Sequence, residues 1–331
     1  MRAGRLVLPA DGPPKAIVVA VHGSERSSGR TGDRLQTLLP AYGIGVFAWD
    51  KRGTGRSKGK YTQDFEILSA DAVLARKEAL RLYGSKVRVG YLGGSQGGWV
   101  APLAAAKAGA DFVIAAYGMA ESPLAEDREE VFQGLRRAGW GDDVIEKARE
   151  ITDATARVMA SDMKEGMTEL SAVRAKYKGE PWFEDLDGEF TGDFMKNSNW
   201  LIQLLGPLFD VGTSWDYDPR PALDAIEVPH LWILAGKDRE APHERTLEIL
   251  REIQDSRPNL DIVVFPNTDH GIFEFVEDAE GNRQPVRFAA GYYPLIRDFI
   301  LKGEADPGVE GPIVYHGARV VEAAPDLIDG L

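Results

Sequence analysis

The stretch "VGYLGGSQGGWVAPLAAA", residues 89–106, places one serine between an apolar run and an alanine-rich run. The apolar run predicts a buried strand ending near Gly94, and the alanine-rich run predicts a helix. The letters between them, residues 93–97, fit G-x-S-x-G with Ser95 in the middle. At a strand-to-helix junction this pattern predicts a strained turn that holds the hydroxyl above the carboxyl end of a sheet. Ser95 is therefore the candidate nucleophile.

A serine nucleophile needs a base, and the base needs an acid that orients it. Of the five histidines, His270 lies in a loop that follows the apolar run beginning at residue 260, and it is the candidate base. His22 closes an early apolar run, and we expect it to brace a loop. The remaining three are expected at a strand start, at a helix start and in the tail: His230, His243 and His316.

The candidate acid is Asp238, which ends the apolar run "HLWILAGKD" at 230–238. Ser95, Asp238 and His270 then follow one another in the order Ser, Asp, His, each at the carboxyl end of a predicted strand. Asp269 is next to His270 in sequence, but we expect its side chain to diverge from the imidazole.

The site also needs donors for the oxyanion formed during acyl transfer. One expected donor is the backbone N–H of Gln96, directly after the nucleophile. The other is the backbone N–H of Ser24, in the loop "VHGSERSSGR" after the first apolar run. The free N–H groups at the start of the predicted helix point toward the same place.

Six apolar runs are continuous rather than alternating, which is typical of strands covered on both faces of a parallel sheet. Helical patterns separate them, so the sequence predicts an α/β fold. The strands are expected at 16–23, 43–50, 87–94, 110–118, 230–238 and 260–271. Clear helical patterns lie at 69–84, 243–254 and 286–303.

Residues 120–220 interrupt this alternation with charged helical sequence followed by a dense aromatic stretch. The predicted organisation is a core of residues 1–119 and 221–303, an inserted helical lid at 120–220, and a tail at 304–331. We expect the main sheet to cover the apolar side chains of the insertion. The aromatic residues either pack the insertion onto the core or line an apolar substrate pocket; the candidates for the pocket are Trp182, Phe194, Trp200, Phe209 and Trp215.

Three motifs resemble those of the α/β-hydrolase superfamily: His22-Gly23-Ser24, the stretch "DKRGTGRS" at 50–57, and the glycine-rich turn at 93–98. Within it the chain is similar to the carboxylesterase, prolyl-oligopeptidase-like and acyl-thioesterase branches, over residues 16–119 and 225–302. The resemblance implies a mostly parallel central sheet flanked by helices, with the insertion where these proteins carry a lid. The chain departs from the superfamily at its start, because we expect little room before residue 16 for the superfamily's first two strands.

The predicted function is hydrolysis of a carboxylic ester through an acyl-enzyme. An acyl-CoA thioesterase or a small serine peptidase of the same fold is the alternative, and a catalytically silent small-molecule binding protein is the non-enzyme alternative. Fluorophosphonate labelling would distinguish the last from an active hydrolase. Within the fold, a dehalogenase would carry aspartate in place of Ser95.

Composition excludes other classes of function. The net charge of −13 disfavours nucleic acid, and no G-x-x-x-x-G-K-[ST] motif predicts a nucleotide site. The histidines are scattered and there is no cysteine, so we expect no metal and no cofactor.

No apolar run is long enough for a membrane span. A cytoplasmic location is expected, and the sequence leaves the oligomeric state open, a homodimer included.

Overall fold

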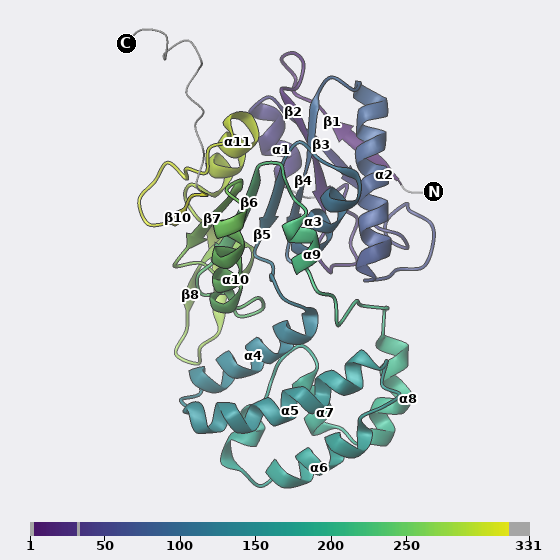
Figure 1. The fold of residues 1–331 in the computed structure, drawn as a ribbon, viewed down its shortest axis with the longest axis vertical. Helices are drawn as coiled ribbons and strands as arrows, with labels where there is room; N and C mark the ends of the chain where they lie inside the picture. The colour runs from purple at the N-terminus through teal and green to yellow at the C-terminus, as the bar shows by residue number, and fades with distance from the viewer. Residues whose placement is uncertain (1–2, 32–33, 318–331) are drawn as a thin grey trace.

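The computed structural model describes residues 3–31 and 34–317. Its main feature is an eight-stranded sheet in which the six central strands run parallel and the two edge strands run antiparallel (Figure 1). In spatial order the strands are β1 (Gly4–Val7), β3 (Ile44–Trp49), β2 (Ala16–Val21), β4 (Arg88–Gly94), β5 (Val113–Ala116), β6 (His230–Ala235), β7 (Leu260–Phe265) and β10 (Ile313–Tyr315). The prediction of an α/β fold with a mostly parallel central sheet is confirmed.

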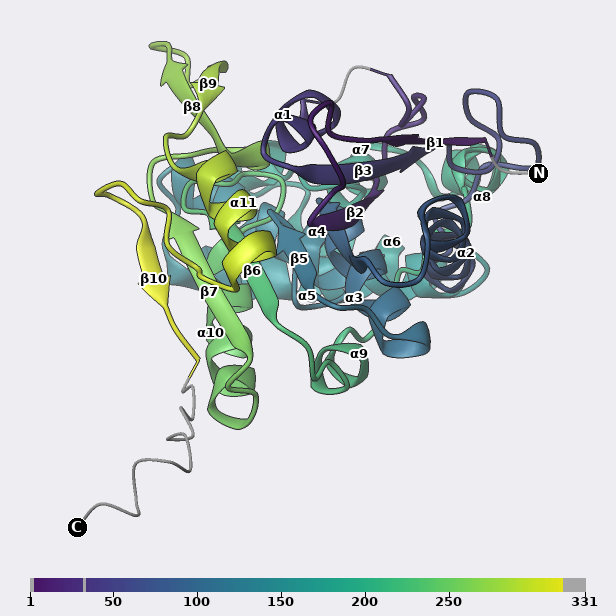
Figure 2. The same cartoon turned by 90° about the horizontal axis from the view of Figure 1, so that it is seen from above.

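Helices cover both faces of the sheet, as the view from above shows (Figure 2). On one face lie α1 (Leu35–Ala41) and α11 (Tyr292–Lys302); on the other lie α2 (Phe65–Tyr83), α3 (Gly97–Ala108), α9 (Arg220–Asp224) and α10 (His243–Ser256). Adjacent strand residues serve opposite faces: Val18 packs with α1 and α11, and Val19 packs with α2 and α3. This two-sided burial explains why the strands are apolar throughout.

Helix α2 begins at Phe65, four residues before the start predicted from the helical pattern at 69–84. Asp64 caps it, because its side chain accepts a hydrogen bond from the Ile67 N–H at 3.0 Å. The helix ends at Gly84, whose φ of 125° disfavours a side chain.

The terminal parts of the core differ from the sequence predictions. Before residue 16, where little room was expected for two strands, the one strand β1 pairs with β3. The predicted helix at 286–303 starts only at Tyr292. The residues before it form β9 (Arg283–Phe288), which pairs with β8 (Phe273–Glu277) in an antiparallel hairpin. Within β9 only the end residues Arg283 and Phe288 are partly buried and the four residues between them are exposed, so the segment lacks the buried stripe of a core helix.

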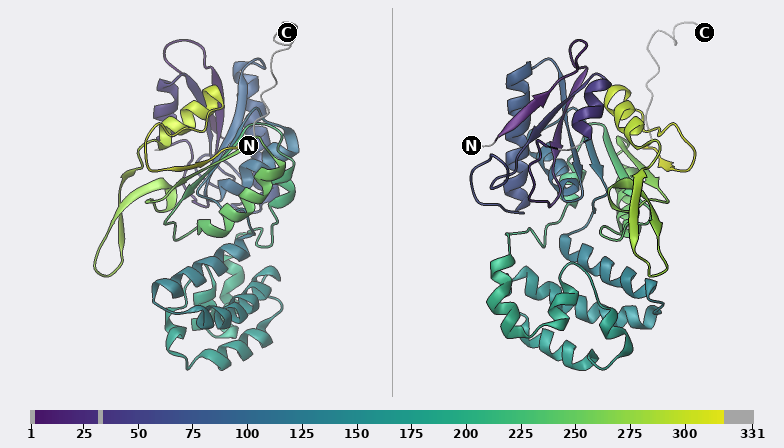
Figure 3. Two further views of the ribbon diagram at one scale, coloured as in Figure 1. Left: turned by 60° about the vertical axis from the view of Figure 1, so that its left-hand side comes forward. Right: turned by 180° about the vertical axis from the view of Figure 1, so that it is seen from behind.

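Residues between β5 and β6 form a separate group of helices below the sheet (Figures 1 and 3). These are α4 (Pro123–Arg137), α5 (Asp142–Ala160), α6 (Met167–Tyr177), η1 (Pro181–Asp185), α7 (Thr191–Lys196) and α8 (Asn199–Phe209). Their buried side chains, from Val131 to Ile202, form a cluster of their own. The expectation that the main sheet would cover them is wrong, because the aromatic and aliphatic residues of these helices cover one another.

Candidate active site

Ser95 lies on the tight turn between β4 and α3, at the carboxyl edge of the sheet. Its φ of 54° is in the left-handed region, which is unfavourable for a serine. Two backbone hydrogen bonds hold the turn: the Ser95 N–H donates to Ala116 O at 3.0 Å, and Ser95 O accepts from the Gly98 N–H at 2.7 Å. The local structure thus keeps Ser95 in a strained conformation.

The glycines around Ser95 are required by close backbone contacts. A Cβ on Gly93 would lie 2.0 Å from Gly97 O, and a Cβ on Gly97 would lie 2.7 Å from Val21 O. On Gly94 it would lie 2.2 Å from the Tyr117 hydroxyl oxygen. The turn therefore closes only because these positions lack side chains.

The loop after β2 reaches the same place. A Cβ built on Gly23 would lie 3.5 Å from the Ser95 Cβ. In the part of the chain that the structure describes, the backbone N–H groups of Ser24 and Gln96 have no hydrogen-bond acceptor. Two free N–H groups beside a nucleophile are what an oxyanion hole requires.

His270 follows β7 and Asp238 follows β6, on neighbouring strands. The His270 Nδ1 lies 3.0 and 3.1 Å from the two oxygens of Asp238, which is 2% exposed. Asp238 also accepts the backbone N–H groups of Glu240 at 3.0 Å and Ala241 at 2.9 Å. The carboxylate is therefore fixed before it contacts the imidazole.

Asp269 faces away from the imidazole ring, as the sequence analysis expected. Its side chain forms an ion pair with Arg283 at 2.9 Å and accepts the backbone N–H groups of His270 at 2.9 Å and Arg239 at 3.3 Å. Asp269 thus shapes the loop that carries His270.

Acidic neighbours change the protonation of His270. Burial lowers the pKa of this imidazole, but the hydrogen bond and charge of Asp238, with the charges of Glu240 and Glu126, raise it to about 9. The Glu240 carboxylate lies 3.6 Å from His270 Nε2, the ring nitrogen opposite Asp238. A protonated imidazole is therefore favoured at neutral pH in the free protein.

Tyr117 and an acidic helix are parts of this site that the sequence analysis missed. The Tyr117 ring packs edge-on against His270, with centroids 5.1 Å apart, and it also reaches Gly94.

On α4, burial and the charge of Glu189 raise the pKa of Glu126 well above its ordinary value. Burial and the charges of Glu126 and Glu189 raise the pKa of Glu130 to about 10. No local motif marks these residues, because they act through contacts between distant segments.

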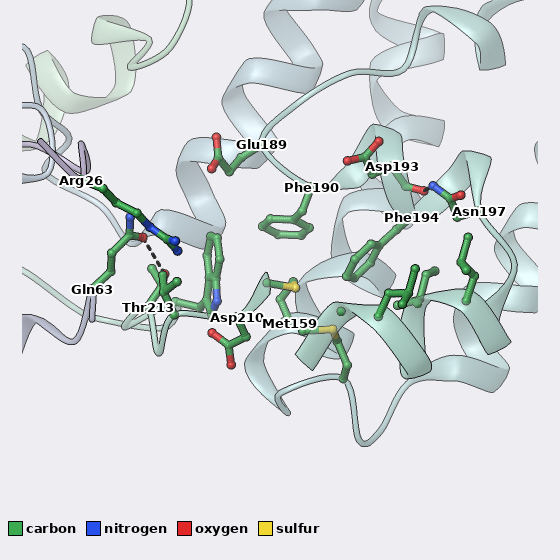
Figure 4. A pocket seen from close by; sticks show the side chains of 17 residues that line it. Arg26, Gln63, Met159, Glu189, Phe190, Asp193, Phe194, Asn197, Asp210 and Thr213 are labelled. Atoms are coloured by element: carbon green, nitrogen blue, oxygen red, sulfur yellow. Dashed lines mark hydrogen bonds between the residues drawn. The ribbon is translucent and has the colours of Figure 1, made fainter. Parts of the chain in front are cut away.

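A cavity of about 510 Å³ lies among the inserted helices and opens to two residues of the core, Arg26 and Gln63 (Figure 4). Phe194 and Trp215 line it. Two other predicted pocket residues do not: Trp182 is 1% exposed within the helical cluster, and Trp200 is 69% exposed on α8. The prediction for Phe209 falls on a side chain outside the described part. Ser95 and His270 do not line this cavity, but Gln63, which does, donates from its side chain to Ser24 O at 3.4 Å.

Gln63 joins the insertion to the core beside this cavity. Its side-chain oxygen accepts from the Thr213 hydroxyl at 2.8 Å, and its backbone oxygen accepts from the Ser214 N–H at 3.4 Å (Figure 4). The chain returning from α8 is therefore fastened to the loop that follows "DKRGTGRS".

Residues 3–31 and 34–317 contain neither a cluster of metal ligands nor a membrane-spanning helix. No group of three or more histidine, aspartate or glutamate side chains there is arranged to hold a metal ion. No helix within the same residues has both the length and the apolarity needed to cross a bilayer.

A mostly parallel sheet with a serine on the strand-to-helix turn is the architecture of the α/β hydrolases. More narrowly, residues 12–183 match the family described as serine aminopeptidase, S33, and the chain belongs to that family. A search of the curated proteins finds no match.

Solved structures with a similar fold are distant in sequence. An esterase of Pyrococcus furiosus is 17% identical, with a TM-score of 0.48, and the match covers 82% of this chain and 83% of the esterase. A proline iminopeptidase of Mycobacterium smegmatis is 18% identical, with a TM-score of 0.48, covering 81% of this chain and 88% of its own. An acylaminoacyl peptidase of Pyrococcus horikoshii is 16% identical, with a TM-score of 0.46, covering 81% of this chain and 35% of its own.

Proposed function

We propose that the chain cleaves a carboxylic ester through an acyl-enzyme formed on Ser95. His270 Nε2 takes the proton from the Ser95 hydroxyl as its oxygen attacks the ester carbonyl. The Ser24 and Gln96 N–H groups hold the oxyanion of the tetrahedral intermediate. The alcohol leaves with the proton from His270, and water repeats the sequence to release the acid.

The observation that carries this proposal is the contact of both Asp238 oxygens with His270 Nδ1. This contact fixes the tautomer in which Nε2 is free to accept a proton, and it stabilises the imidazolium that forms. The raised pKa of His270 accords with this role, because the same carboxylate stabilises the charged ring.

The cavity supports an ester over a thioester of coenzyme A. Three carboxylates, Glu189, Asp193 and Asp210, line it together with one guanidinium, that of Arg26. A ligand with several phosphates would be repelled by that charge. Phe194 and Trp215 offer apolar surface to an acyl or aryl group instead.

The same charge distribution favours a second candidate, a substrate with a free amine, such as an aminoacyl ester or amide. The carboxyls of Glu126 and Glu130 have raised pKa values because burial and neighbouring carboxylates oppose their ionisation. A bound ammonium group would relieve that repulsion. This is consistent with the description of the family as serine aminopeptidase.

We also propose that residues 120–220 act as a lid that sets substrate choice and contributes no triad residue. The segment leaves the core after β5 and returns before β6, beside the strands whose ends carry Ser95 and Asp238. In Figures 1 and 3 its helices lie across that edge of the sheet, with α4 nearest.

The experiment compares p-nitrophenyl esters, acyl-CoA thioesters, aminoacyl p-nitroanilides and their N-acetylated forms, together with fluorophosphonate labelling. Ester turnover with labelling that is lost in Ser95→Ala supports the first proposal. Preference for free over N-acetylated aminoacyl substrates supports the second. Failure to label a folded protein, with no turnover of any substrate, would favour a silent binding protein.

A further inference from the structure

Lys51 is a buried cation directly behind the loop that carries Ser24. It follows β3 in the "DKRGTGRS" stretch, and it is 3% exposed. Its ammonium group donates a hydrogen bond to the Gly23 carbonyl oxygen. A lysine is rarely buried to this extent unless the surrounding structure makes use of its charge.

The Gly23 carbonyl and the Ser24 N–H are the two ends of one peptide group. A positive charge on the carbonyl oxygen draws electron density from the nitrogen, so the N–H becomes a stronger donor on the opposite side. The peptide therefore connects the ammonium group of Lys51 to the place where the oxyanion of an ester intermediate would form. The effect is larger than in water, because the cation is buried.

We propose that Lys51 is a positioning residue that strengthens the oxyanion hole through the Gly23–Ser24 peptide. This inference rests on the proposed hydrolase function and deepens it. Lys51 touches neither the substrate nor the nucleophile, and it acts only through this peptide.

The surroundings of Lys51 keep the peptide in one orientation. The Tyr61 hydroxyl donates to Ser24 O, at the other end of the same residue. The Lys51 ammonium lies 5.3 Å from the centre of the Tyr61 ring, and the Arg26 guanidinium covers that ring at 4.6 Å. The loop is thus held by cations and a phenol, and the Gln63 amide also donates to Ser24 O at 3.4 Å.

The rest of the motif fastens the far end of the same loop. Asp50 accepts from the Ser28 hydroxyl at 2.5 Å and from the Arg30 Nε at 2.8 Å. Gly55 allows this approach, since a Cβ there would lie 2.4 Å from an Asp50 oxygen. Asp50 and Lys51 therefore bind opposite ends of one loop. Of these contacts, the Lys51 hydrogen bond is made to the Gly23–Ser24 peptide.

Glu25 supplies the opposing charge. A Cβ on Gly23 would lie 2.7 Å from a Glu25 oxygen, so this carboxylate is close to the same peptide. A carboxylate near the hole opposes formation of an oxyanion, and the Lys51 ammonium offsets it. Burial lowers the pKa of Lys51 to about 8 while Glu25 acts to raise it, which keeps the amine mostly charged at neutral pH.

The first test is Lys51→Met, which keeps the apolar stem and removes the charge. We expect kcat for p-nitrophenyl butyrate to fall about tenfold or more with little change in KM, because the negative oxygen is absent from the bound ester and develops in the transition state. Lys60→Met, at an exposed position on the same turn, is the matched control and should retain the parent kcat. Ser95→Ala is assayed in parallel.

These variants test the role of Lys51 and the proposed hydrolase function separately. If Ser95→Ala abolishes turnover and folded Lys51→Met keeps the parent kcat, the inference is overturned and the proposed function stands. If turnover survives Ser95→Ala, the proposed function itself fails.

The second test distinguishes charge from loop support. In Lys51→Ala, added n-propylammonium should restore part of kcat, whereas n-propanol of similar size should not. Equal restoration by both, or restoration by neither, would assign the lysine to holding the loop and would overturn the inference. Thermal unfolding of each variant identifies any loss of kcat that comes from loss of fold.

Discussion

Both oxygens of Asp238 contact Nδ1 of His270, at 3.0 and 3.1 Å, while Nε2 of the same ring lies 3.6 Å from the Glu240 carboxylate. One side of the imidazole therefore meets a buried, fixed carboxylate, and the other meets an exposed, movable one. The difference decides which carboxylate can orient the ring and which can only change its charge.

The first prediction concerns that orientation. Asp238→Asn should lower kcat by about 10³–10⁴-fold, because an amide stabilises the wrong tautomer of His270. Asp269→Asn is the matched control, since its side chain pairs with Arg283 away from the ring. Steady-state kinetics on a p-nitrophenyl ester provide the measurement. A larger loss from Asp269→Asn than from Asp238→Asn would show that the acid is misassigned.

The second prediction concerns pH. The imidazole must be neutral to accept the serine proton, and the pKa of His270 is raised to about 9. We therefore expect kcat/KM to be low at neutral pH and to rise as His270 loses its proton. Because Lys51, with a pKa of about 8, loses its charge over the same range, the full rise through an ionisation near 9 is expected in Lys51→Met. Glu240→Gln removes one charge that stabilises the imidazolium, so it should move this ionisation to lower pH.

The measurement is kcat/KM between pH 5 and 10 with an ester whose spontaneous hydrolysis is subtracted. Glu244→Gln, on the exposed face of α10, serves as the charge-matched control. A profile that is flat over this range, with chemistry shown to be limiting, would contradict a histidine base.

The third prediction concerns the elbow. Gly93→Ala should destabilise the fold by about 3 kcal/mol or more, because the new methyl group meets Gly97 O at 2.0 Å and backbone must move. Gly179→Ala should change stability little, since a Cβ there meets nothing within 4 Å. Urea unfolding of both variants gives the comparison. Equal stability of the two would mean that the turn relaxes at no cost.

The fourth prediction concerns the cavity of the inserted helices. Phe194→Ala and Trp215→Ala should flatten the dependence of kcat/KM on acyl chain length, at ~0.8 kcal/mol for each methylene no longer buried. Turnover of p-nitrophenyl acetate should persist. Leu208→Ala, 75% exposed on α8, is the control. If both cavity variants keep the parent profile from acetate to octanoate, the acyl group binds elsewhere.

The sequence was sufficient for the parallel strands because each is buried on both faces, which leaves an unbroken apolar run. It was insufficient for the β8–β9 hairpin, where Val286 is exposed and Phe288 packs on Phe273 with ring centroids 4.1 Å apart. That contact joins segments whose pairing no short window contains. The same reason hid Tyr117 from the site prediction, since its role comes from its position between Gly94 and His270.

The individual members of the site were predictable to different degrees. Ser95 is marked by its own neighbours in sequence. Asp238 and His270 are marked only by their positions after strands, and their assignment as a triad stays a prediction. The aromatic residues of the insertion could not be sorted from sequence, because Trp182 and Trp200 look alike there and differ only in which side of a helix faces the cluster.

The separate hydrophobic cluster of the inserted helices has a consequence for how this protein can change. Its members, from Val131 to Ile202, belong to none of the clusters that hold the sheet. Mutations that reshape the cavity therefore change the packing of this cluster. They do not change the packing of the clusters that keep Ser95 in its strained conformation. Under the proposed function, substitutions in the inserted helices can therefore change substrate choice while the packing around Ser95, Asp238 and His270 is kept.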